Sequence, residues 1–129
     1  MGLDMYAHAV PVELLNSDKE VDLKYEIPDG YRLAYWRKFN NLQGWMWRLY
    51  EQKGGMDHDF NCALLRLNSD DLDQLEKDIG EEDLPPQEGF FFGGCEEFNQ
   101  EMADKIREFI ANARAAIAAG KAVLYYAWW

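Results

Sequence analysis

Four side chains in this sequence have the chemical types that metal sites and hydrolytic sites use: Asp4, His8, His58 and Cys62. Carboxylate, imidazole and thiolate groups are ligands for zinc and iron, and a histidine can activate a thiol nucleophile. One interpretation is therefore a small metal- or cysteine-dependent hydrolase, with the segment 57–59 supplying part of the site. The other interpretation is a polar turn before a strand, with Cys62 packed as a small apolar residue.

A second thiol, Cys95, follows Gly93 and Gly94 and precedes a segment of helical periodicity. At the start of a helix, backbone amides and the helix dipole lower the pKa of a cysteine. A glycine pair is equally a flexible entry to a helix. Two cysteines and two histidines are too few for a disulfide framework or a second pair of metal ligands. We therefore predict no cofactor.

Negative charge is concentrated in one segment of the chain. Between Asn68 and Glu101 there are twelve acidic residues and one base, Lys77, an excess equal to the net charge of −11 of the whole protein. A field localised in this way selects partners of opposite charge. The predicted partner is a protein with a basic surface, and a narrower form of this hypothesis is imitation of nucleic-acid phosphates. The carboxylates expected to make the contact are Asp70, Asp71, Asp73, Glu76, Asp78, Glu81, Glu82 and Asp83.

The acidic balance also disfavours two classes of partner. Direct binding to nucleic acid needs Lys and Arg to neutralise phosphates, and an anionic membrane surface repels a negative chain. No apolar stretch reaches transmembrane length, and the first residues lack the basic and apolar regions of an export signal. We expect a reduced, cytoplasmic protein.

Three consecutive phenylalanines, Phe90, Phe91 and Phe92, stand between glycines in a segment rich in turn residues. They cannot all point inward from a simple turn. Either this loop folds under the domain, or it anchors a partner. A second copy of the chain is one such partner, which would make a homodimer in which the loop meets the Trp128-Trp129 end.

The elements that position these residues follow from periodicity. A chain of 129 residues with 15% aromatic residues supports one domain, residues 1–129, with a core built on rings. The predicted strands are 3–10, 21–27, 60–67 and 122–129. The predicted helices are 31–52, 69–79 and 98–117, the first divided at Asn40-Asn41. This order predicts an α+β fold, with a mixed or antiparallel sheet of about four strands and helices mainly on one face.

Three details of this prediction depend on particular residues. Leu33 and Trp36 are spaced by three residues, which favours a helix, and Asn41 is expected to cap the helix that follows. The segment 60–67 is expected to be an interior strand. Four rings either line a pocket for a planar ligand or belong to the core and its rim: Trp36, Trp45, Tyr125 and Trp128.

Four sequence landmarks also carry a resemblance. The first is the start, Met1-Gly2-Leu3-Asp4-Met5-Tyr6, and the second combines Tyr35-Trp36-Arg37-Lys38 with Leu42-Gln43-Gly44-Trp45-Met46. The third is Gly89-Phe90-Phe91-Phe92-Gly93, and the fourth is the end, Tyr125-Tyr126-Ala127-Trp128-Trp129. Together they resemble a family of small bacteriophage and prophage proteins with an MGLDMY start and an aromatic C-terminus. The resemblance implies a phage or prophage accessory protein of one domain. The basic partner predicted from the charge pattern would then be a host or phage protein, and in the narrower hypothesis a host nucleic-acid-binding protein that this chain antagonises. The resemblance implies no activity, cofactor or catalytic residue.

Overall fold

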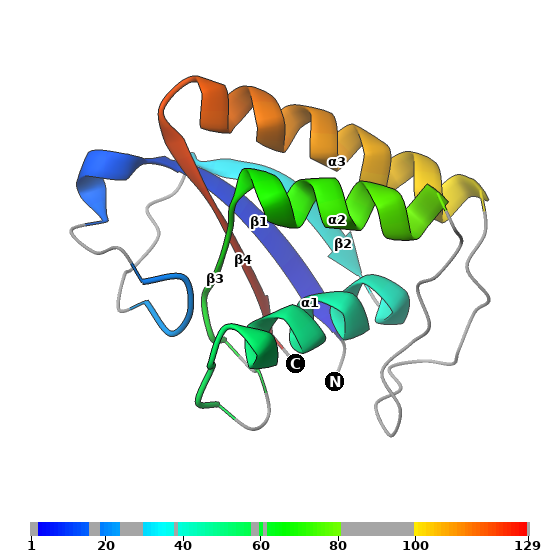
Figure 1. Ribbon diagram of the computed structural model, residues 1–129, viewed down its shortest axis with the longest axis horizontal. Helices are drawn as coiled ribbons and strands as arrows, with labels where there is room; N and C mark the ends of the chain where they lie inside the picture. Colours follow the sequence, from blue (N-terminus) through cyan, green and yellow to red (C-terminus); the bar gives the residue numbers. More distant parts are fainter. Residues whose placement is uncertain are drawn as a thin grey trace.

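The chain forms a single four-stranded antiparallel sheet with three α-helices on one side of it (Figure 1). The computed structural model describes residues 3–15, 19–23, 30–37, 39–57, 60, 62–80 and 100–128, and all statements on structure refer to these. The strands are β1 (Asp4–Pro11), β2 (Arg32–Arg37), β3 (Leu65–Leu67) and β4 (Lys121–Trp128), in the spatial order β2-β1-β4-β3. The helices are α1 (Asn40–Gln52), α2 (Ser69–Gly80) and α3 (Gln100–Ala118), and a short 3₁₀ helix η1 spans Val12–Leu14. The predicted α+β class is confirmed.

The two ends of the chain supply the centre of the sheet. β1 and β4 pair over their full length, from Asp4 opposite Trp128 to Pro11 opposite Lys121. Both strands were predicted from their apolar runs, and both are confirmed. Because side chains alternate along a strand, the odd-numbered residues of β4 face the helices and the even-numbered ones face the other side of the sheet.

The first part of the predicted helix 31–52 is wrong, because Arg32–Arg37 forms strand β2. β2 pairs with β1, and the register shifts so that Ala7 lies opposite Ala34 while His8 lies opposite Arg32. Leu33 is therefore the extra residue of a β-bulge, and it packs against the same core as Trp36. The bulge brings two apolar residues three positions apart onto one face, which is the spacing that a helix also produces.

Two further expectations are corrected at element ends. Asn41 does not cap α1, because it lies within the first turn and is buried, and Phe39 occupies the capping position without a side-chain hydrogen bond. Residues 60–67 do not form an interior strand, because β3 holds only Leu65–Leu67 and lies at an edge of the sheet. The cap of α2 is Asn68, whose Oδ1 accepts from the backbone amide of Asp71 at 2.9 Å.

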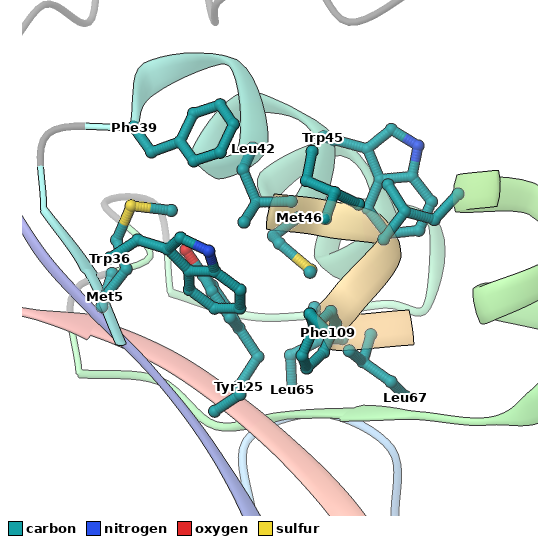
Figure 2. Packing of buried hydrophobic residues seen from close by; sticks show 14 of the residues in the cluster. Met5, Trp36, Phe39, Leu42, Trp45, Met46, Leu65, Leu67, Phe109 and Tyr125 are labelled. Carbon is teal, nitrogen blue, oxygen red and sulfur yellow. The ribbon is translucent and has the colours of Figure 1, made fainter. Parts of the chain in front are cut away.

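Rings fill the space between the sheet and the helices. Tyr125 and Trp36 point from the sheet toward Met46 of α1 and Phe109 of α3 (Figure 2). The Trp36 and Phe109 rings meet edge to face with centroids 5.1 Å apart. Such contacts add to the free energy gained by burying apolar area, so this cluster holds all three helices on one side of the sheet.

On the other side of the sheet, the described residues cover only one half. There Val10, Ala122 and Leu124 pack with Leu15, Leu23 and Leu64 in a second, smaller cluster. The predicted strand 21–27 is not continuous in its described part: Val21 makes one bridge to Leu65, and Asp22 has a φ of 53°. Residues 24–29 lie outside the described residues. Leu23, from the described part of that segment, thus covers the Val10 end of this face.

Tyr50 connects the segment that contains Asp22 to the turn after α1 through hydrogen bonds. Its ring is fully buried, and its hydroxyl donates to Asp22 Oδ1 and accepts from the backbone amide of Asp57 at 2.8 Å. Burial, and then the hydrogen bond to Asp22, raise the pKa of Tyr50 to about 12. A Cβ at position 55 would lie 2.2 Å from the Tyr50 ring, so this contact needs glycine, which has no Cβ.

Tyr50 should therefore stabilise the fold by an amount that depends on pH. The folded protein holds the phenolic proton more tightly than the unfolded chain, so the contribution is full below pH 10 and is lost as pH rises toward about 12. Comparing the unfolding free energies of wild type and Tyr50→Phe across this range measures it. A difference between the two proteins that does not shrink with rising pH would contradict the assignment.

Candidate functional site

The uncovered half of the sheet's second face carries aromatic rings on three neighbouring strands. Tyr6 and His8 come from β1, Tyr35 from β2, and Tyr126 and Trp128 from β4. With Arg32, Arg37 and Asp4 they form what we term the open aromatic face. Solvated sheet faces usually carry polar side chains at such alternating positions, yet here Tyr35 is 44% exposed and Trp128 is 60% exposed.

Four rings of this face, those of Tyr6, His8, Tyr35 and Tyr126, form a connected row. Ring centroids of Tyr6 and Tyr35 are 5.2 Å apart, and those of Tyr6 and Tyr126 are 5.1 Å apart and stacked. His8 stacks on Tyr126 at 5.7 Å. These side chains extend from strands that are hydrogen-bonded to each other, so the row is held by rigid backbone.

Two arginines accompany the rings. The Arg32 guanidinium lies 5.2 Å from the ring centre of Tyr6 and 5.5 Å from that of Tyr35, which are cation–π distances. Among the described residues, neither Arg32 nor Arg37 forms an ion pair. Asp4 accepts a 2.7 Å hydrogen bond from the Tyr35 hydroxyl. It lies opposite Arg37 in the ladder, and no ion pair joins Asp4 to either arginine in the described part of the chain.

His8 is the buried member of the row. Burial, and then the charge of Arg32, lower the pKa of His8 below 6.5. The imidazole is therefore neutral at pH 7, and its Nδ1 has no hydrogen-bond partner among the described residues. It contributes a flat apolar ring to the face and no charge.

Removing the positive charge next to His8 should move its titration. In Arg32→Gln the pKa of His8 should rise toward the ordinary value while staying below it, because the larger cause, burial, remains. NMR titration of the imidazole measures this, with Arg37→Gln as the matched control. Equal His8 pKa values in wild type and Arg32→Gln would contradict the position of Arg32.

The acidic residues predicted as a contact surface lie partly on α2, and most of these have partners inside the chain. Arg114 of α3 pairs with Asp73 at 2.6 Å and with Glu76 at 2.9 Å. Asp71 pairs with the largely buried Lys53. Asp70 is exposed and makes no ion pair within the described residues. Three of the others, Glu81, Glu82 and Asp83, lie outside the described residues, so the acidic surface stays a prediction.

A groove of about 520 Å³ between α1 and α2 is lined by Trp45, Arg48, Asp71 and Asp78, among others. Three of its polar side chains, Trp45, Gln74 and Asp78, bond to each other. Trp45 Nε1 donates to Asp78 Oδ2 at 2.8 Å, and Gln74 Nε2 donates to Asp78 Oδ1 at 2.8 Å. We therefore assign this groove a packing role.

The residues of the hydrolase hypothesis are not gathered into one site where they are described. Asp4 and His8 share a face of β1, but Tyr6 lies between them and four residues of strand span roughly 13 Å. Cys62 is exposed beside β4, with its amide bonded to the Ala127 carbonyl at 2.7 Å. Partial desolvation, and then Asp57, raise the pKa of Cys62, which disfavours the thiolate. No cluster of three potential metal ligands occurs in the described part of the chain, and His58 lies outside it.

Other candidates divide between core and surface. Trp36, Trp45 and Tyr125 are buried in the core, whereas Trp128 belongs to the open aromatic face. Phe90, Phe91, Phe92 and Cys95 lie outside the described residues.

The sequence analysis did not single out Tyr6, Tyr126 or Arg32 for the site. The available signal was the i, i+2 spacing of Tyr6 with His8 and of Tyr126 with Trp128, which places rings on one strand face.

Comparison of the chain with protein-family models, curated proteins and solved structures gives no match. The resemblance to phage and prophage proteins therefore stays a prediction. Of the helices in the described ranges, none combines the length and apolar character that a membrane crossing requires.

Proposed function

We propose that this protein is a binding module whose contact surface is the open aromatic face. One observation carries the proposal: a connected row of rings stands at outward positions of a rigid sheet. Tyr35 of this row and Trp128 on the same face are among the most exposed large apolar side chains described. Exposed apolar patches of this kind mark interaction sites. Tyrosine, tryptophan and arginine are also the residues that contribute most to binding free energy at interfaces.

The ion pairs made by the acidic residues of α2 favour the open aromatic face, and not the surface of α2, as the contact surface. Asp71, Asp73 and Glu76 bond to Lys53 and Arg114, so a partner would have to compete with contacts that the fold already makes. Arg32 and Arg37 have no such ion pairs among the described residues, and they are exposed. The open aromatic face thus carries two exposed cations that make no ion pair within the described residues.

Affinity capture from a bacterial lysate tests the proposal. The double variant Tyr35→Ala/Trp128→Ala removes two exposed rings from the face. The matched control Leu14→Ala/Met56→Ala removes two exposed apolar side chains elsewhere. We expect wild type and the control to capture the same macromolecule and the ring variant to lose it. Equal capture by all three proteins, or none by wild type, would contradict the proposal.

A further inference from the structure

We propose that the open aromatic face binds single-stranded nucleic acid, with bases stacked on its rings and phosphates held by Arg32 and Arg37. This inference rests on the proposed function, because it names the partner of the same surface. Its chemistry combines an aromatic platform and cationic groups that follow a phosphate backbone.

Base stacking needs ring surface that remains exposed, since Tyr6, His8 and Tyr126 already stack on one another. Tyr35, Tyr6 and Tyr126 lie on adjacent strands with successive centroid separations of 5.2 and 5.1 Å. Exposed ring surface remains at Tyr35 and at Trp128 on the same face. Stacking is tolerant of sequence, because every base has a flat π surface. Bases paired inside a duplex present only their edges, so this surface selects unpaired strands.

The local charge is complementary to phosphate, although the whole chain is acidic. Strand pairing and ring contacts place Arg32, Arg37 and Asp4 beside the rings, two positive groups and one negative. Asp4 is engaged by the Tyr35 hydroxyl. Arg32 lies against two rings, and a guanidinium in that position can still direct N–H groups at a phosphate.

The open aromatic face and the acidic residues of α2 lie on opposite sides of the sheet. The exposed carboxylates Asp70, Asp73 and Glu76 belong to α2, on the opposite side of the sheet. A helix is about 10 Å thick, and the screening length is about 8–10 Å at 0.10–0.15 M salt. Repulsion between those carboxylates and a strand on the open aromatic face is therefore largely screened. Among the described residues, the acidic side chains of α2, which contribute to the whole-chain charge, are therefore not the groups that a ligand meets on this face.

The composition of the face favours nucleic acid over a protein partner. Around the rings there are guanidinium groups and one carboxylate, while the aliphatic residues of this side of the sheet belong to the covered half. Binding of a protein in place of an oligonucleotide would contradict this inference.

Fluorescence anisotropy with labelled oligothymidylate and oligouridylate, each about eight nucleotides long, tests the inference. Wild type should bind both, and should bind a duplex of that length about tenfold more weakly or worse. Tyr35→Ala should weaken binding by about 5- to 100-fold. Tyr35→Phe, which keeps the ring, and Met56→Ala, outside the face, should stay near wild type. Circular dichroism verifies folding of each variant.

Salt dependence gives a second readout that loss of structure does not imitate. Two phosphate contacts predict a slope of about −1.4 in log K against log salt, and Arg37→Gln should reduce its magnitude by about 0.7. Absence of oligonucleotide binding at low salt, duplex binding equal to single-strand binding, or unchanged affinity in Tyr35→Ala would overturn the inference. If the lysate experiment still captured a nuclease-resistant protein through the rings, the proposed function would stand while this inference failed.

Discussion

Replacing Tyr125 with alanine should lower the free energy of unfolding by about 3–5 kcal/mol. Tyr125 is fully buried on the central strand β4, and its ring lies 6.0 Å from that of Phe60 and 6.5 Å from that of Trp36. The substitution removes these contacts and leaves a cavity where the sheet meets α1 and α3. Urea denaturation monitored by circular dichroism measures the loss.

Tyr125→Phe is the control for this prediction. It retains the ring and deletes the hydroxyl that donates to Gln43 Oε1. Gln43 is buried, and its Nε2 already has no partner among the described residues. Losing the hydrogen bond from Tyr125 to Gln43 should lower the free energy of unfolding by about 1–3 kcal/mol. Equal destabilisation by the alanine and phenylalanine variants would show that the ring does not contribute the packing assigned to it.

Replacing Lys53 with methionine should destabilise the protein by about 3–5 kcal/mol. Lys53 Nζ lies 3.4 Å from Glu20, pairs with Asp71, and donates to the Arg66 carbonyl at 2.7 Å. The side chains of Lys53 and Asp71 are 10% and 11% exposed, so removing the ammonium leaves a nearly buried carboxylate without its counter-charge. Methionine keeps the length of the side chain, which restricts the change to charge. Chemical denaturation measures it.

Lys105→Met provides the comparison. Lys105 pairs with Glu101 one helical turn away, and both side chains are mostly exposed. Its loss should cost less than about 0.5 kcal/mol. Similar small effects of both substitutions would mean that Lys53 does not fasten α1 and β3 to α2 in the way described.

Much of the fold can be predicted from the sequence, because most elements have an unambiguous period. Leu72, Leu75 and Ile79 form the stripe that α2 buries, and the apolar end of the chain forms a central strand. β2 was missed because a β-bulge at Leu33 produces the three-residue spacing of a helix. Periodicity alone does not distinguish these cases, since the bulge depends on pairing with β1.

The site is less predictable, because it depends on strand order. Tyr6, Tyr35 and Tyr126 are 29 and 91 residues apart in the sequence, and they meet only because β1 lies between β2 and β4. The charge pattern drew attention to α2, but a sequence does not show that Arg114 of α3 bonds to Asp73 and Glu76. Contacts between elements therefore decided both which groups have partners and which rings stay exposed.

The most direct measurement of the central claim is NMR mapping of backbone amides while two probes are added separately, oligothymidylate and an oligolysine peptide. We predict that oligothymidylate shifts the amides of β1, β2 and β4 around Tyr6, Tyr35 and Tyr126 and leaves α2 unchanged. The peptide should cause only weak shifts. Strong shifts at Asp70, Asp73 and Glu76 with the peptide, and none around the tyrosines with the oligonucleotide, would contradict the claim.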